Sequence, residues 1–313
     1  MSKSFPLVLR LLASSTNVAA KAGNIIKDVM TKGELGIIEK GTDKNDLQTE
    51  ADRSAQKCII ASLSRLYPEV TIIGEEGPEC NQDEELPQDW IVTEQDLEVL
   101  NSNCPPEYSQ VDPKDIVIWV DPLDGTSEYT QGLLDHVTVL IGLAINGKAV
   151  GGVIHQPYHN YKVNKNCKGR TLWGLLGLGV GGFNPTSPPS DKFVITTTRS
   201  HADAIVNKTL EALHADEVIR VGGAGHKVLM LLEGKAHAYV FASKGCKKWD
   251  TCAPEGILKA LGGVLTDIYG KEYDYSRDVS YPNAQGIFAT SKYVNHQELI
   301  SKIPQELKDR FPY

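Results

Sequence analysis

The chain has 313 residues, of which 41% are hydrophobic and 23% charged, and its formal net charge at pH 7 is −8. This composition provides enough apolar side chains for a sizeable core in one large domain or two. The negative charge argues against a protein that binds nucleic-acid polymers by neutralising their phosphates. No apolar run reaches the length of a membrane span. We therefore expect a protein without membrane or nucleic-acid partners.

The first 65 residues predict two helices. Apolar side chains recur at helical spacing from Phe5 to Val29, and the charge of Arg10 among them favours a core helix over a secretory signal. A mitochondrial presequence is an alternative for the same stretch. A second helical pattern begins at Ala51-Asp52, after acidic residues at 43, 46 and 50. Asp52 is therefore either a functional carboxylate or an ordinary residue at a helix start.

Residues 116–127 contain the most informative pattern, Ile-Val-Ile-Trp-Val-Asp-Pro-Leu-Asp-Gly-Thr-Ser. The β-branched and aromatic residues predict a buried strand that ends on Asp121 and Asp124. Because charges are costly to bury, two carboxylates at a strand end usually face a cation or have shifted pKa values. Mg²⁺ prefers such oxygen ligands, and a Gly-Thr-Ser turn offers N–H groups to an anion. The pattern indicates phosphate chemistry; the alternative is an Asp-Pro turn with Asp124 as a helix cap.

Two more acidic segments follow the same logic. A short predicted strand over 70–74 ends in Gly-Glu-Glu-Gly, so that Glu75 is either a metal ligand or part of a solvated turn. Farther along, Asp250 resembles the N-cap of a helix predicted over 254–261, with Pro254 in its first turn. Capping is the alternative reading of Asp250. Taken together, the acidic segments supply the ligands that a two-metal phosphatase needs.

Several other sites are excluded or disfavoured. An EF-hand starting at Asp121 would have Leu123 at its third position and Gly132 at its twelfth. Haloacid dehalogenase phosphatases have one residue between their two aspartates, whereas two intervene here, so that family remains a weaker alternative. The GxGxxG pattern at 177–182 precedes a proline-rich segment that cannot form a helix, which indicates a structural strand or turn. No P-loop or HExxH pattern occurs.

The remaining elements suggest two halves. Paired strands are expected at 137–145 and 149–156 around Asn146-Gly147, and strands at 193–198, 238–241 and 264–267 alternate with helices at 204–214, 227–233 and 254–261. We therefore expect an α/β protein with an α+β domain over 1–158 and an α/β domain over 159–313. Residues 79–115 form an acidic excursion without an assigned role. The six cysteines show no CxxC pair or metal spacing, so reduced thiols in a cytoplasmic protein are expected.

These motifs, in this order and spacing, resemble the lithium-sensitive, magnesium-dependent phosphatases that include inositol monophosphatase. The resemblance is carried by residues 74–76, 121–126 and 249–255. Within that superfamily the chain is most similar to the 3'(2'),5'-bisphosphate nucleotidases, through residues 127–132, 196–201 and 221–227. The match extends from about Lys40 to Lys292. It implies a layered αβαβα sandwich with the site in a cleft between the halves.

The resemblance also implies a role for individual residues. The ligands of two or three Mg²⁺ ions would be Glu75, Asp121, the carbonyl of Leu123, Asp124 and Asp250. Thr126 would orient the attacking water, and Asp52 would accept the proton of the Thr126 hydroxyl. Phosphate oxygens would be bound by the N–H groups of Gly125, Thr126 and Ser127. Nucleotide contacts would come from Thr198, His201, Gly223 and Lys227, the histidine and lysine meeting the phosphate that stays on the product.

The implied reaction is lithium-sensitive hydrolysis of the 3'-phosphate of adenosine 3',5'-bisphosphate, by direct attack of water and without a phosphoenzyme. The related 3'-phosphoadenylyl sulfate and inositol 1,4-bisphosphate are further candidate substrates. A preference for inositol phosphates is the nearest alternative, and a non-catalytic nucleotide or metal sensor is an alternative of another class. Individually, His201 and Lys227 could also be a helix cap and a solvated lysine.

Overall fold

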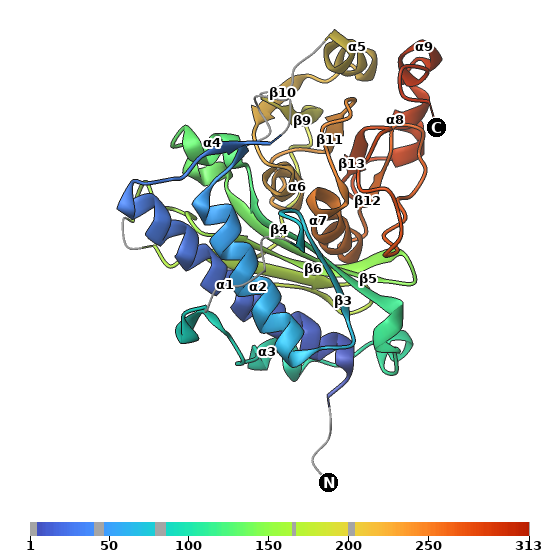
Figure 1. Ribbon diagram of the computed structural model, residues 1–313. Coiled ribbons are helices and arrows are strands. Elements are labelled where there is room, and N and C mark those ends of the chain that lie inside the picture. The colour runs from blue at the N-terminus through green and yellow to red at the C-terminus, as the bar shows by residue number, and fades with distance from the viewer. Residues whose placement is uncertain (1–4, 41–46, 79–85, 165–166, 200–203, 313) are drawn as a thin grey trace.

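The computed structural model describes residues 5–40, 47–78, 86–164, 167–199 and 204–312. Two β-sheets alternate with three layers of helices, so the described chain forms an αβαβα sandwich (Figure 1). This arrangement confirms the predicted fold class.

The first sheet has six strands in the order of the chain. β3 is parallel to β4, and the remaining neighbours are antiparallel. All nine residues of β4 are buried because helices cover both faces of the sheet. The predicted turn at Asn146-Gly147 joins β5 to β6, and both of its residues have positive φ angles. The strands are β3 (Thr71–Gly74), β4 (Ile116–Asp124), β5 (Thr138–Ile145), β6 (Lys148–Gln156), β7 (Arg170–Leu175) and β8 (Gly179–Gly181).

Two long helices cover the outer face of this sheet. α1 (Leu7–Lys32) and α2 (Glu50–Leu66) pack against each other and against β4 to β7, and their buried apolar residues form one core with those strands. Between these helices in the chain, β1 (Ile38–Glu39) pairs antiparallel with β2 (Leu47–Gln48). The described part of the 79–115 excursion contains α3 (Leu97–Leu100), which contacts α1. The two predicted N-terminal helices are therefore confirmed.

The second sheet has five strands in the order β10-β9-β11-β13-β12. Its strands are β9 (Val194–Thr198), β10 (Glu217–Val221), β11 (Ala238–Phe241), β12 (Val264–Thr266) and β13 (Ile287–Thr290). The helices α6 (Ala224–Leu232) and α7 (Lys248–Ala260) lie between the two sheets. The outer face is covered by α5 (Ala204–Leu213), α8 (His296–Ser301) and α9 (Gln305–Lys308).

The chain passes from the first sheet to the second between Gly181 and Val194. The boundary expected at residue 158 precedes β7 and β8, yet both strands pair within the first sheet. The signal for these strands is weak, because glycines interrupt the apolar alternation on which the prediction depends. β8 lies inside the GxGxxG pattern, which agrees with its interpretation as a strand or turn.

Two glycines allow α7 to approach the first sheet closely. A Cβ atom on Gly142 would lie 2.6 Å from the backbone nitrogen of Ala253, and one on Gly152 would lie 2.6 Å from the Cα of the same residue. Any larger residue at these positions of β5 and β6 would push the helix away. The close contact brings the first turn of α7, which carries Asp250, to the end of β4.

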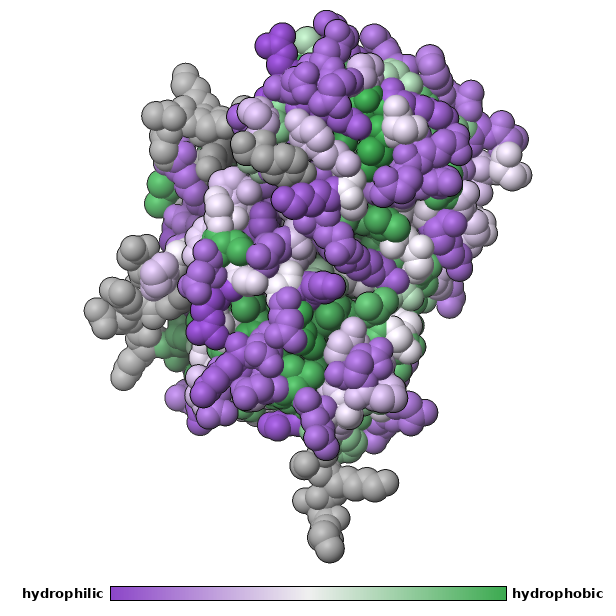
Figure 2. Space-filling model, turned by 90° about the vertical axis from the view of Figure 1, so that its right-hand side faces the viewer, coloured by the Kyte–Doolittle hydropathy of each residue, from purple (hydrophilic) through white to green (hydrophobic). Residues whose placement is uncertain are grey.

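One face of the molecule is mostly polar. Figure 2 shows hydrophilic side chains over most of one face, with smaller hydrophobic areas between them. Among the helices of the described residues, none combines the length and apolar character needed to cross a bilayer.

Candidate active site

Three carboxylates meet where β4 ends. Asp121 and Asp124 come from β4 and Asp250 from the first turn of α7, and one oxygen of each lies within 4.8 Å of the others. The pairing of β4 with β5 shifts in register between Asp121 and Asp124. Such an irregularity re-aims side chains at a strand end. The Leu123 N–H donates to Asp121 Oδ1 at 3.0 Å, which orients that carboxylate.

Burial and mutual repulsion dominate the electrostatics of this cluster. Burial raises the pKa of Asp121 well above its ordinary value, and the carboxylates of Glu75, Asp124 and Asp250 raise it further. Burial, followed by Glu75 and Asp124, raises the pKa of Asp250 to about 8. Ionising all of these groups together is therefore costly without a positive charge. A divalent cation with oxygen ligands would remove that cost.

Asp124 is also held by the second half of the molecule. Its Oδ1 accepts from the Ala224 N–H at 2.7 Å and its Oδ2 from the Gly225 N–H at 2.9 Å. Thr138 of β5 donates its hydroxyl to the same Oδ2 at 2.6 Å. Burial raises the pKa of Asp124, and these hydrogen bonds act in the opposite direction. A carboxylate at the N-terminus of α6 thus joins the two halves across the cleft.

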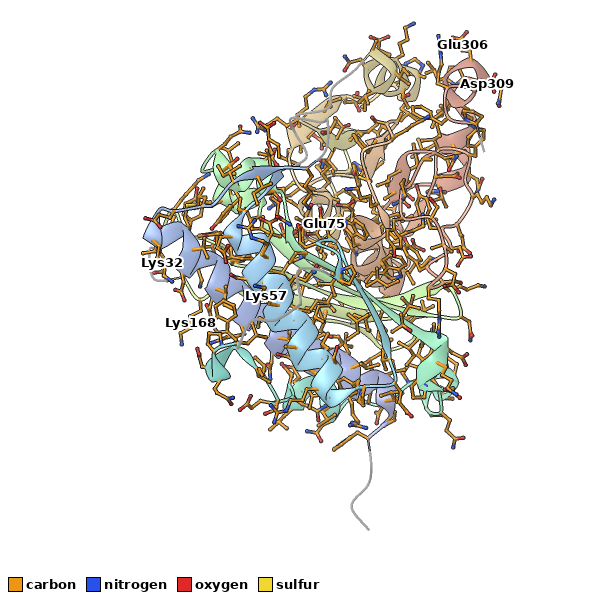
Figure 3. All side chains as sticks on the ribbon, viewed as in Figure 1. Lys32, Lys57, Glu75, Lys168, Glu306 and Asp309 are labelled. Atoms are coloured by element: carbon orange, nitrogen blue, oxygen red, sulfur yellow. The ribbon has the colours of Figure 1, made fainter. Side chains whose placement is uncertain are left out.

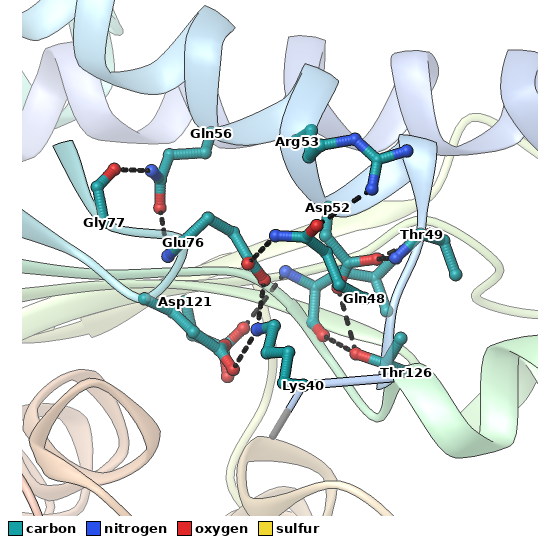
Figure 4. Close-up of polar contacts among 12 residues, drawn as sticks. Lys40, Gln48, Thr49, Asp52, Arg53, Gln56, Glu76, Gly77, Asp121 and Thr126 are labelled. Carbon is teal, nitrogen blue, oxygen red and sulfur yellow. Dashed lines mark hydrogen bonds and ion pairs between the residues drawn. The ribbon is translucent and has the colours of Figure 1, made fainter. Parts of the chain in front are cut away.

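Asp52 and Thr126 form the second feature of the site (Figure 4). Thr126 begins the short helix α4 (Thr126–Thr130), and its hydroxyl lies 2.9 Å from Asp52 Oδ1 and 3.1 Å from the Leu123 carbonyl oxygen. Thr49, not Asp52, is the N-cap of α2, and its backbone N–H donates to Asp52 Oδ2 at 2.7 Å. Burial raises the pKa of Asp52 to about 7, partly offset by the Thr49 hydroxyl.

The predicted start of the helix behind Asp250 was wrong. α7 begins at Lys248, so Asp250 is its third residue and Pro254 lies in the helix interior. Asp250 Oδ2 still accepts a hydrogen bond, at 2.6 Å, from the N–H of Lys247, the N-cap residue. Proline is most common in the first turn of a helix, and this preference placed the predicted start of the helix too late. Asp250 therefore accepts a hydrogen bond that stabilises the start of α7, and it also faces the other two aspartates.

Glu75 lies directly after β3, near the middle of the molecule (Figure 3). Lys40, which the sequence did not predict as a partner, places its Nζ 3.1 Å from Glu75 and 2.7 Å from Glu76. Burial alone would lower the pKa of Lys40, but these two carboxylates outweigh it and raise that pKa. Glu76 is buried and also accepts a hydrogen bond from Gln48 (Figure 4). In the sequence, the adjacent glutamates Glu75 and Glu76 were the feature that could have predicted a lysine partner.

The cleft beside the acidic cluster is lined by most of the residues that the sequence assigned to substrate binding. They are Gly125, Thr126, Ser127, Thr198, Gly223 and Lys227, together with the metal-ligand candidates Glu75, Asp124 and Asp250. Lys227 is buried rather than solvated: its Nζ donates to the Gly223 carbonyl at 2.9 Å and lies 5.4 Å from the ring centre of Tyr239. The helix containing it begins at Ala224, earlier than predicted. His201 lies outside the described residues.

Comparisons with known proteins agree with this geometry. The model of the inositol monophosphatase family matches residues 9–308. The chain belongs to the inositol monophosphatase family. This chain is 51% identical over 310 residues to a human protein named 3'(2'),5'-bisphosphate nucleotidase 1, and the match covers 99% of each chain. A cattle protein named Golgi-resident adenosine 3',5'-bisphosphate 3'-phosphatase is 32% identical over 94% of this chain and 80% of its own length.

Solved structures of the inositol monophosphatase family have the same fold. An IMPase from Thermotoga maritima superposes with a TM-score of 0.66 at 21% identity, covering 95% of this chain and 98% of its own. The family model and the human relative confirm the resemblance drawn from the sequence motifs. Membership of this family leaves no support for the haloacid dehalogenase alternative.

Proposed function

We propose that the chain is a Mg²⁺-dependent phosphomonoesterase that hydrolyses the 3'-phosphate of adenosine 3',5'-bisphosphate to give AMP and phosphate. The observation that carries this proposal is the convergence of three aspartates, two of them buried and one half-buried, with a Thr–Asp hydrogen bond at one cleft. The names of the relatives support the nucleotide as substrate.

The donor set fits magnesium. Every candidate ligand is an oxygen, supplied by Glu75, Asp121, Asp124, Asp250 and the Leu123 carbonyl, and burial disfavours the ionised aspartates until a cation joins them. We propose two or three ions. Bound Mg²⁺ would neutralise phosphate charge, stabilise the leaving alkoxide and lower the pKa of a water molecule.

The chain's own residues would hold and orient the reactants. Asp52 Oδ1 lies within hydrogen-bonding distance of the Thr126 hydroxyl, so Asp52 would take that proton while the Thr126 oxygen accepts one from the attacking water. The N–H groups of Gly125, Thr126 and Ser127 would bind phosphate oxygens at the start of α4. No side chain serves as nucleophile in this scheme, so water attacks the phosphorus directly and no phosphoenzyme forms.

Substrate recognition would come from the second half of the molecule. Thr198, Gly223 and Lys227 would contact the nucleotide, with His201 and Lys227 meeting the phosphate that remains on the product. The buried ammonium of Lys227 supports this role, because a cation next to the acidic cluster favours an anionic ligand there. We further propose 3'-phosphoadenylyl sulfate and inositol 1,4-bisphosphate as additional substrates, and a cytoplasmic location.

Phosphate release provides the test. We expect turnover of adenosine 3',5'-bisphosphate to exceed that of inositol phosphates, to stop in excess EDTA and to be inhibited by millimolar lithium. Full activity in EDTA would contradict the metal dependence, and faster turnover of inositol monophosphate would favour the alternative substrate class. Nucleotide binding without turnover in Mg²⁺ would indicate a sensor instead of an enzyme.

A further inference from the structure

Glu128 is a buried carboxylate at the edge of the cleft, outside the set of candidate metal ligands. It lies in α4, and its side chain is 4% exposed. Its Oε1 accepts a charge-assisted hydrogen bond at 3.2 Å from Nη2 of Arg199, and the same nitrogen donates to Gln131 at 2.8 Å. Arg199 directly follows β9, so this ion pair connects α4 of the first half to the second sheet.

The same carboxylate contacts the turn between β10 and α6. A Cβ atom on Gly222 would overlap the Cγ, Cδ and Oε1 atoms of Glu128, so this position accommodates only glycine while Glu128 keeps its place. The N–H of Gly222 donates to His136 Nδ1 at 3.1 Å, which ties the turn to the first half a second time. Glu128, Thr198, Gly222 and Gly223 all line the cleft.

A carboxylate at this position costs free energy of folding. It is buried, and it adds a negative charge to a cleft that, by the proposed function, receives an anion. Arg199 offsets the charge, but an apolar side chain of similar size would fill the space without that requirement. What the carboxylate adds is a directional bond between the two walls of the cleft.

We propose that Glu128 is a positioning residue for substrate recognition. Through Arg199 and Gly222 it holds the wall formed by Thr198, Gly222 and Gly223 at a fixed distance from the turn that carries Thr126. This inference rests on the proposed function and adds to it the residue that sets the geometry of the nucleotide-contacting wall.

The test compares the nucleotide with p-nitrophenyl phosphate, a phosphate ester that lacks the nucleoside. For Glu128→Ala and Arg199→Ala, we expect KM for adenosine 3',5'-bisphosphate to rise roughly ten- to a hundred-fold, as for loss of a charged hydrogen bond, while kcat changes much less. Glu128→Gln keeps the size and one acceptor, so its KM should lie between the wild-type and Ala values. Turnover of p-nitrophenyl phosphate and its Mg²⁺ dependence should change little in all three variants.

A second pair of variants examines the contact with the turn. Gly222→Ala alone should raise KM for the nucleotide because the new methyl group overlaps Glu128. In the double variant Glu128→Ala/Gly222→Ala the overlap is gone, so its KM should be no higher than that of Glu128→Ala. The proposal would be wrong if the two substitutions multiplied their effects on KM in the double variant. It would also be wrong if the variants lost activity equally on both substrates. Failure of the wild-type protein to hydrolyse the nucleotide would instead overturn the proposed function.

Discussion

Thr126 and Asp52 are joined by a hydrogen bond of 2.9 Å although 74 residues separate them in the chain. The bond connects the first residue of α4 to the first turn of α2. The Thr49 backbone N–H occupies the other oxygen of Asp52 and fixes the carboxylate in this orientation. The hydroxyl of Thr126 is thereby held beside the aspartate cluster before any substrate binds.

Removing this hydroxyl should abolish most of the activity. Thr126→Val keeps the shape of the side chain but cannot relay a proton, and we expect kcat to fall by roughly two to four orders of magnitude, as for loss of general acid–base assistance. Thr126→Ser keeps the hydroxyl and should retain most of the rate. Initial rates at saturating Mg²⁺ would measure both. A Thr126→Val enzyme within a few-fold of wild type would mean that the Thr–Asp bond only stabilises the structure.

Much of the site could be predicted because the carboxylates end recognisable elements. Asp121 and Asp124 close a buried strand, and Glu75 follows a half-buried one, so the edge on which they lie was evident from hydrophobic patterns. The contacts between distant segments could not be predicted. The bond between Asp124 and the N–H of Ala224 spans 100 residues, and no local propensity encodes such a pairing.

The exact starts of the helices also could not be predicted from the sequence. Asp52 and Asp250 both occupy the third position of their helices and accept a hydrogen bond from the N-cap residue's backbone. An acidic residue near a helix start fits the N-cap and the third position equally well in a single sequence. The ion pairs of Lys40, which directly follows β1, reach glutamates 35 and 36 residues farther along the chain, and no local pattern predicts such contacts.

The metal-free protein should lose stability as pH rises. The pKa values of Asp52 and Asp250 rise on folding from an ordinary 3.8 to about 7 and about 8. Between these values the two aspartates bind more protons in the folded chain than in the unfolded chain, so their contribution to the free energy of unfolding decreases with increasing pH. The buried histidines His155, His226 and His296 act in the opposite direction, but only up to about their ordinary pKa of 6.5, because burial lowers their pKa values. We therefore expect the melting temperature in EDTA to fall from pH 7 to pH 8. Mg²⁺ should stabilise the protein most at the upper end, because it favours the ionised carboxylates.

Thermal melts at several pH values, with EDTA or with Mg²⁺, provide the measurement. Asp250→Asn is the matched variant, because it removes one of the two groups and should reduce the slope in EDTA. A melting temperature in EDTA that increases over this range would contradict the assigned shifts.

Direct attack by water should invert the configuration at phosphorus. With a chiral phosphate ester as substrate, inversion is expected because a single displacement occurs and no phosphoenzyme intervenes. Acid quenching or borohydride trapping during turnover should likewise detect no aspartyl phosphate. Retention would require a double displacement, and Asp121, placed at the end of β4, would then become a nucleophile instead of a metal ligand.

The final prediction separates the two roles of Asp250. Its Oδ2 accepts the Lys247 N–H at 2.6 Å, and the amide oxygen of asparagine can accept the same bond, so Asp250→Asn should preserve the start of α7. In EDTA its melting temperature should equal or exceed that of the wild type, because a buried carboxylate is gone. As a metal ligand, however, Asp250 contributes a full charge, and turnover should fall by roughly two to four orders of magnitude. Excess Mg²⁺ should restore part of the rate. Near-normal turnover at low Mg²⁺ would show that Asp250 only stabilises the start of α7 and is not a metal ligand.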